Sequence, residues 1–238
     1  MPTLAYTSIT ELFNVYRQLR QSENNYILRE DYITYFDIIY SILYIFRIRL
    51  IKVNDFNFSN INFSLIIKSE LTKIKGDNIA IEGWINYFFF KRAKNKKLNI
   101  LKLIDWWENQ STDKGMNLGF KKYYPYSKSL GYLGYAPRFL ELQLMPSEYE
   151  CRYNLIPDEI SVHGKSLIDS ISQLNKNLKV IVAPAFRYNY LWNINKKFNH
   201  KITNILVALP VLIDESIEII KLLEKLINNL GNNNIKFY

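Results

Sequence analysis

From Leu98 onward, short apolar runs alternate with segments that have helical spacing. This alternation is typical of β-α-β units, in which helices connect the parallel strands of one sheet. The strands are predicted at residues 98–104, 129–135, 139–145, 160–162 and 180–182. The pattern therefore predicts an α/β fold with a largely parallel, Rossmann-like sheet over residues 98–188.

Residues 1–97 lack this alternation and are predicted to form a mainly helical region in front of the sheet. Apolar residues near the N-terminus recur at spacings of three and four, and Thr7, Ser8 or Thr10 could cap that helix. Further helices are expected at 32–51 with Asp31 as cap, at 63–74 and at 79–93. The polar segment 55–62 is expected to be a loop.

The C-terminal part of the sequence contains one more predicted strand-helix-strand unit. Residues 189–202 are rich in Asn and Lys and are expected to be a linker. A strand at 205–209, a helix from about 214 to 229 and a strand at 235–238 follow. Because such a sheet is incomplete, we expect residues 203–238 to be the start of a truncated second Rossmann-like domain, or one that a partner chain completes.

The cysteine and histidine content and the net charge limit which metal sites and binding partners are expected. One cysteine, Cys151, and two distant histidines make a multi-ligand metal site unexpected, and Cys151 is expected to be packed. The net charge of +9 follows largely from a general Asn/Ile/Lys/Tyr bias. The alternative is attraction to nucleic acid, anionic lipid or phosphorylated substrates, although no nucleic-acid recognition motif is present.

No signal peptide is predicted, since residues 1–20 lack an apolar core segment. The most apolar early stretch, residues 35–46, is shorter than the roughly 20 residues that a membrane span needs. Basic and aromatic residues flank it, so peripheral membrane association stays open.

Polar side chains that could bind a ligand or take part in catalysis are most concentrated directly after the first predicted strand, at Glu108, Asn109 and Gln110. In open α/β sheets, ligands bind at the carboxyl ends of the strands. Partial burial would raise the pKa of Glu108 and suit it to act as a general base. The structural alternative is that Glu108 caps the next helix or pairs with a lysine.

Three other groups of residues allow both a functional and a structural interpretation. Asp113 and Lys114, near a helix start, could contact a substrate or provide a cap and surface charge. The turn at His163–Ser166 could hold a phosphate but is more simply a strand-to-helix connection. Arg187 could contact a phosphate or pack in the linker.

Several blocks between Asp105 and Arg187 occur in a recognisable order. They are Glu108-Asn109-Gln110, Asp113-Lys114-Gly115-Met116-Asn117-Leu118-Gly119-Phe120, Pro125, Gly131-Tyr132, Pro146-Ser147, Glu150, Ile156-Pro157-Asp158, Val162, Gly164 and Ala183-Pro184-Ala185-Phe186-Arg187-Tyr188. This segment resembles bacterial surface-carbohydrate biosynthesis proteins of the capsule and O-antigen class, which look like two-Rossmann, GT-B type glycosyltransferases. Such proteins often have a histidine soon after the Gly-Tyr of the second strand, where this chain has Leu133-Gly134-Tyr135, and their His-Pro element would lie beyond Tyr238.

The resemblance implies transfer of a sugar from a nucleotide-sugar donor to a glycan or lipid-linked glycan acceptor, without a metal or a further cofactor. Glu108 would be the catalytic base. The substrate-binding residues would be Trp107 (or Trp106), Asn109, Gln110, Asp113, Lys114 and Arg187. The implied location is the cytoplasm, or the inner face of the membrane. The alternative is an inactive truncated or split chain that binds a glycan or a partner.

Overall fold

The computed structural model describes residues 8–24, 26–52, 55–73, 79–137, 141–193, 204–210, 213–230 and 236–237. The chain divides into two compact units, Met1–Arg187 and Tyr188–Tyr238.

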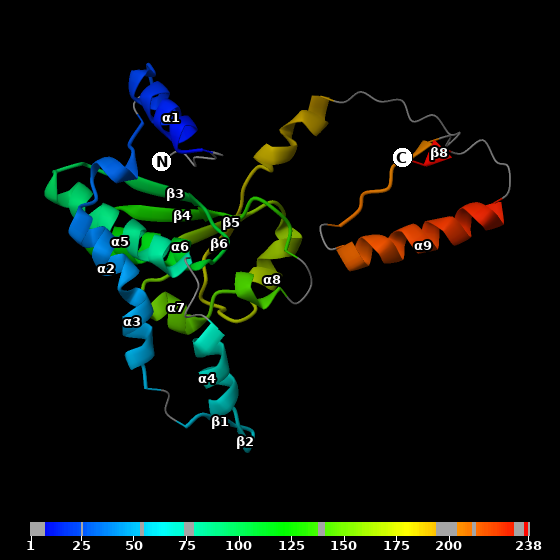
Figure 1. Cartoon of the computed structure of the whole chain (residues 1–238), viewed down its shortest axis with the longest axis horizontal. Coiled ribbons are helices and arrows are strands. Elements are labelled where there is room, and N and C mark those ends of the chain that lie inside the picture. Colours follow the sequence, from blue (N-terminus) through cyan, green and yellow to red (C-terminus); the bar gives the residue numbers. More distant parts are fainter. Residues whose placement is uncertain are drawn as a thin grey trace. The chain divides into compact units, whose positions relative to one another are not determined.

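The first unit is built on a four-stranded parallel sheet (Figure 1). Its strands are β3 (Lys102–Trp106), β4 (Lys128–Tyr132), β5 (Glu159–Val162) and β6 (Val180–Val182), in the spatial order β3-β4-β5-β6. The connecting helices are α6 (Ser111–Tyr123), α7 (Glu148–Arg152) and α8 (Ile168–Ile171). The predicted α/β fold with a parallel sheet is confirmed.

The strand predicted at 139–145 is wrong at residues 142–144. Leu142–Leu144 forms a 3₁₀ turn, and residues 138–140 lie outside the described part of the chain. Leu144 and Met145 are nevertheless buried, because they anchor this connection in the core. Their apolar character therefore reflects packing of a loop and not strand pairing.

Successive neighbouring strands joined by right-handed crossovers place their helices on the same face of a sheet. Two buried clusters occupy that face. One contains Trp107, Leu133, Leu144, Ile160, Val162 and Ile171, and the other contains Phe89, Phe90, Ala93, Phe120 and Tyr124. On the opposite face Ile104 and Trp106 are 64% and 48% exposed. The order of the strands thus gives the sheet one covered face and one open face.

The region before the sheet is mainly helical. Its helices are α1 (Ile9–Gln21), α2 (Tyr35–Ile42), α3 (Tyr44–Arg47), α4 (Ser64–Lys73) and α5 (Ile79–Asn95), with 3₁₀ turns at Arg29–Asp31 and Ile48–Leu50. Ser8 caps α1 by accepting a hydrogen bond from the Glu11 amide. The predicted loop at 55–62 contains a short antiparallel pair, β1 (Asn57–Phe58) and β2 (Ile61–Asn62).

The helix predicted at 32–51 starts later and is broken near Leu43. Its cap is Thr34 and not Asp31: the Thr34 hydroxyl accepts from the Asp37 amide, and the Thr34 amide donates to Asp37 Oδ2 at 2.8 Å. This reciprocal capping box supplies partners for two amides at the helix start. Asp31 instead forms an ion pair with Arg20.

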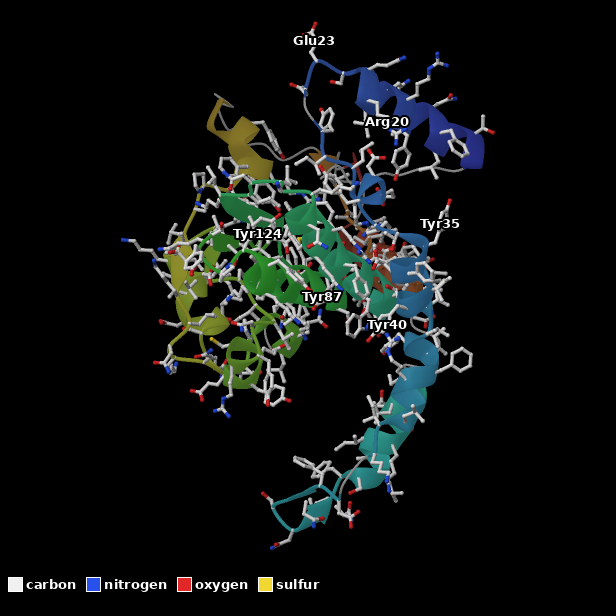
Figure 2. The ribbon with its side chains drawn as sticks, turned by 90° about the vertical axis from the view of Figure 1, so that its left-hand side faces the viewer. Arg20, Glu23, Tyr35, Tyr40, Tyr87 and Tyr124 are labelled. Carbon is white, nitrogen blue, oxygen red and sulfur yellow. The ribbon has the colours of Figure 1, made fainter. Side chains whose placement is uncertain are left out.

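Helices α5 and α6 cross with their backbones in contact, because glycines lie at the crossing. Gly83 and Gly115 face each other, and Gly119 lies against the backbone of Tyr87. The Tyr87 and Tyr123 hydroxyls are 3.0 Å apart across the same helix pair, and Figure 2 shows Tyr87 and Tyr124 in this helical layer. Helix α5 and residues 27–33 therefore share a core with the sheet, in line with the single unit Met1–Arg187.

Asp37 and Arg92 tie α2 to α5. Arg92 donates to both Asp37 oxygens, at 2.7 and 2.8 Å, and Asp37 is almost fully buried. Burial raises the pKa of Asp37, but the hydrogen bonds from Arg92 and Thr34 outweigh it and hold the pKa below its usual value.

Asp37→Asn is therefore expected to lower the free energy of unfolding by about 3 kcal/mol at pH 7, because it leaves Arg92 without its buried partner. The carboxylate stabilises the fold above its unfolded pKa of about 3.9, and this contribution is lost as pH falls through the lower folded pKa. The difference between wild type and variant should thus shrink near pH 3 in denaturant titrations. The exposed Asp55→Asn variant is the control and should match wild type at both pH values.

The second unit is a single β-α-β arrangement. β7 (Asn204–Ile205) and β8 (Lys236–Phe237) are parallel, with α9 (Ile213–Leu230) between them in sequence. The helix matches its prediction to within a residue at each end, and β7 is shorter than the strand predicted at 205–209. Residues 235 and 238 of the last predicted strand lie outside the described residues. The boundary between the units lies within a 3₁₀ segment, Phe186–Asn193, and residues 194–202 of the predicted linker lie outside the described residues.

Candidate functional site

A cavity of about 920 Å³ runs along the edge strand β3. Its walls come from α1, from residues 27–30, from α5, from β3 and from the first turns of α6. Small-molecule sites in proteins usually occupy about 300–1,000 Å³. The cavity is therefore large enough for a sugar or a similar polar molecule.

Asp105, the fourth residue of β3, carries the most perturbed carboxylate in the described lining of this cavity. It shares a strand face with Leu103, which packs against the α5–α6 cluster, so its side chain turns toward the covered side of the sheet. Only 9% of Asp105 is exposed, and its Oδ2 atom has no hydrogen-bond partner within the described part of the chain. Burial, together with the charge of Asp113, raises the pKa of Asp105 to about 7.

A group that titrates near the working pH can both take up and release a proton during a reaction. Buried polar atoms in proteins normally have partners, so an exception inside a cavity calls for an explanation. Asp105 therefore has the protonation behaviour of a general acid or base, and its unpartnered Oδ2 atom is shielded from solvent although the residue lines the cavity.

Asp113 is a second acid in the cavity lining, and its hydrogen-bond partners give it a structural role. Its Oδ2 accepts from the backbone amides of Glu108 and Gln110, both at 2.9 Å. Burial raises the pKa of Asp113 and the amide hydrogen bonds oppose this effect, with a net increase. Asp113 thus caps α6 and fixes the loop after β3, while its charge contributes to the raised pKa of Asp105.

The opposite wall is held by a network around Arg29. Arg29 Nη1 donates to Glu82 Oε2 at 2.6 Å and to Asn86 Oδ1 at 2.8 Å, and Asn86 Nδ2 donates to the Thr112 carbonyl at 3.2 Å. This network connects residues 27–30 with α5 and α6. Because the Arg29 charge is paired with Glu82, the acidic groups around Asp105 favour hydroxyl donors over phosphates.

Glu108 lies just beyond the end of β3 and is half-buried. Its two oxygens accept from Trp106 Nε1 at 2.8 Å and from Gln110 Nε2 at 2.7 Å. Trp106 also lines the cavity. Glu108 and Gln110 thus hold the Trp106 indole in place, and Glu108 is not the carboxylate that lines the cavity.

Asn109 and Lys114 belong to a polar network beside the cavity. Asn109 adopts a left-handed backbone conformation (φ 57°), and its amide donates to the Gln143 carbonyl at 2.8 Å and to Glu150 Oε1 at 3.3 Å. Lys114 pairs with the same Glu150 oxygen at 2.7 Å. These contacts join the loop after β3 and helix α6 to α7, which is a structural role.

The expectation that Trp107 stacks on a ligand is corrected by its burial. Trp107 is 0% exposed and lies in the core cluster under the sheet, so a ligand cannot reach its ring. Trp106 points the other way and is half-exposed. Its ring lies over Gly134, where any β-carbon would meet the indole at 1.9 Å, so a glycine is required there.

Aromatic rings also gather on the open face, at the carboxyl edge of the sheet. Tyr132 contacts the rings of Trp106, His163 and Phe186 at centroid distances of 5.8, 5.5 and 5.6 Å. His163 Nε2 is 3.0 Å from the Tyr132 hydroxyl, which supports the interpretation of the 163–166 turn as a structural connection.

Arg187 is exposed directly after Phe186, at the end of the first unit. Cys151, expected to be packed, is exposed because α7 presents it to solvent.

Sequence reasoning missed the residues that define the cavity. Asp105 lies inside the stretch that is richest in polar function, but the sequence pattern favoured Glu108. The available signal was strand alternation, which places an acid at position 105 on the same face as Leu103. Arg29, Glu82 and Asn86 come from distant segments and carry no local signal.

Among the residues that the structure describes, no cluster of histidine, cysteine and acidic side chains could hold a metal ion. Over the same residues, no helix has both the length and the apolar character needed to cross a bilayer. No family model matches the chain, and neither a curated protein nor a solved structure is significantly similar to it.

Proposed function

We propose that this chain takes part in sugar transfer from a nucleotide-sugar donor to a hydroxyl of a glycan or lipid-linked glycan acceptor, as in the synthesis of a surface polysaccharide or lipopolysaccharide. The observation that carries the proposal is Asp105, a buried carboxylate with an unpartnered oxygen and a pKa of about 7, which lines a cavity of suitable size. The parallel sheet and the residue blocks between Asp105 and Arg187 support a GT-B type architecture.

In this proposal the cavity along β3 takes the acceptor. Carboxylates accept hydrogen bonds from sugar hydroxyls and repel phosphates, so the acidic lining suits a neutral, hydroxyl-rich acceptor. The half-exposed Trp106 ring offers an apolar surface for a sugar face. The donor phosphates would bind elsewhere, in a second Rossmann-like domain to which residues 203–238 contribute or which a partner chain completes.

The reaction step follows from the protonation of Asp105. The acceptor oxygen attacks the anomeric carbon of the donor, and its proton passes to the Asp105 carboxylate. The bond between the anomeric carbon and the phosphate oxygen breaks, and the electron pair leaves with the nucleotide. A base whose pKa lies near 7 is about half ionised at neutral pH and is basic enough to take the proton as it is released. No metal or additional cofactor enters this step.

A lipid-linked acceptor would be presented at a membrane surface. We therefore also propose that the protein acts on the cytoplasmic side, at the inner face of the membrane.

A nucleotide-release screen tests the proposal with a panel of nucleotide sugars and glycan acceptors. Glu108→Gln is the informative variant, because it weakens the hold on Trp106 and Gln110 but leaves Asp105 intact. We expect turnover to fall by about 10-fold, in line with a positioning role. The control is Glu148→Gln, an exposed acid in the first turn of α7, which should match wild type.

Two outcomes would contradict the proposal. A loss of about 1,000-fold in Glu108→Gln would make Glu108 the base in place of Asp105. Glycan binding without nucleotide release from any donor would indicate the non-catalytic alternative, a chain that only binds a glycan or a partner.

A further inference from the structure

The segment from α2 to residue 50 buries polar residues and exposes apolar ones, whereas an ordinary surface helix does the opposite. Its inward side carries the polar residues Asp37 and Ser41, both buried, followed by Ile48. Its outward side carries large apolar and aromatic residues. These are Tyr35 (86% exposed), Phe36 (83%), Ile39 (53%), Leu43 (43%) and Leu50 (80%), which we call the outer face.

The polar contacts of the inward side fix this orientation. Arg92 of α5 holds both oxygens of Asp37, and the Ser41 hydroxyl donates to the Asp37 carbonyl at 2.7 Å. Rotating α2 to bury its apolar side would break the buried ion pair. Figure 2 shows the result: Tyr35 projects away from the ribbon, whereas Tyr40 lies toward α5, where its ring meets Trp84 and Phe88.

The charge around the outer face is positive. Residues 32–52 include Arg47, Arg49 and Lys52, and their single acid, Asp37, is neutralised by Arg92. The Arg47 guanidinium lies 3.9 Å from the Tyr40 ring centre and 5.3 Å from that of Trp84, on the α5 side of the segment, whereas Lys52 is exposed at its end. Exposed apolar side chains flanked by cations are typical of helices that lie in a membrane interface.

We propose that the outer face docks on the surface of an anionic lipid bilayer, with Tyr35, Phe36 and Leu50 entering the headgroup region and the exposed Lys52 contacting lipid phosphates. Two observations favour lipid over a folded protein partner. The exposed residues are aliphatic and aromatic side chains that suit the interface, and the surrounding charge complements anionic headgroups. The inference rests on the exposed apolar residues and the positive charge of this segment, and it holds whether or not the chain transfers sugar.

Co-sedimentation of the full chain with vesicles tests this proposal. Wild type should bind vesicles with about 30% phosphatidylglycerol and bind far less to pure phosphatidylcholine, and about 0.5 M salt should weaken the binding. Phe36→Ser/Leu50→Ser should lower the partition coefficient by about 10-fold or more, because both side chains lose their apolar contact with the bilayer. Both positions are already exposed, so thermal unfolding should be unchanged.

The matched control is Leu101→Ser/Tyr126→Ser, which removes one exposed aliphatic and one exposed aromatic residue near β3 and β4. Its vesicle binding should stay within about 2-fold of wild type. The proposal would be overturned if the Phe36→Ser/Leu50→Ser variant bound vesicles as well as wild type does. It would also be overturned if wild type bound neither kind of vesicle. A wild-type dimer in light scattering that Phe36→Ser/Leu50→Ser dissociates would also overturn it, since the outer face would then join two copies.

Discussion

Asp105→Asn is expected to lower the rate of sugar transfer by about 10²–10⁴-fold, the range typical of losing a general base. The amide has nearly the same shape as the carboxyl group but cannot accept a proton from the acceptor hydroxyl. In wild type, kcat/KM should fall as pH drops below about 7, because Asp105 becomes protonated. The residual rate of the variant should not show this dependence.

The same substitution is expected to stabilise the protein above pH 7. In the folded state the carboxyl keeps its proton up to about pH 7, whereas in the unfolded chain it loses it near pH 4. Wild-type stability should therefore fall as pH rises from about 4 to 7, by on the order of 4 kcal/mol from this group. Asn should recover on the order of 2 kcal/mol at pH 8, since a buried amide still lacks partners.

The control for both measurements is Asp169→Asn, an exposed acid in the first turn of α8. It should match wild type in rate and in unfolding at pH 5 and pH 8. Wild-type turnover in Asp105→Asn would remove Asp105 from the reaction. Lower stability of this variant at pH 8 would show that the ionised carboxylate has a favourable partner in the folded protein.

Gly115→Ala is expected to lower the free energy of unfolding by about 3–5 kcal/mol, because α5 and α6 must move apart. A β-carbon on residue 115 would lie 1.9 Å from the Gly83 carbonyl oxygen, and a backbone atom cannot turn aside as a flexible side chain can. The intrinsic helix preference favours Ala over Gly by about 1 kcal/mol, so the expected direction opposes propensity. Urea unfolding followed by circular dichroism measures the change.

Gly164→Ala is the matched control for this effect. The nearest atom to a β-carbon at residue 164 is Ser166 Oγ at 3.9 Å, an ordinary contact, and the backbone is extended. Its stability should stay within about 0.5 kcal/mol of wild type. If Gly115→Ala were equally mild, the close crossing of α5 and α6 would be wrong. The position of α5 and α6 in the cavity wall would then be contradicted as well.

The sheet could be predicted because each strand is short, apolar and bounded by turn residues. β4, β5 and β6 lie close to their predicted positions. The strand predicted at 98–104 spans Lys102–Trp106 as β3, since Leu98 and Ile100 pack as a loop on the α5–α6 cluster. Hydrophobic periodicity indicates burial, and it cannot tell burial in a strand from burial in a connection.

The location of the candidate site could be predicted, but its key residue could not. The sequence pointed to the end of the first strand, where Asp105, Glu108 and Asp113 all lie. Their roles depend on partners: Trp106 and Gln110 bind Glu108, backbone amides bind Asp113, and one oxygen of Asp105 has none in the described residues. The wall formed by Arg29 and Asn86 depends on the packing of residues 27–30 and α5 beside β3, which no local pattern encodes.

The protonation of Asp105 in solution tests the central claim most directly. Aspartate side chains can be labelled with ¹³C at the carboxyl carbon, and the resonance missing from the Asp105→Asn spectrum identifies Asp105. Its chemical shift should titrate with a pKa of about 7. A pKa at or below about 4, the value of an exposed aspartate, would contradict both the burial of this carboxylate and its use as a base at neutral pH.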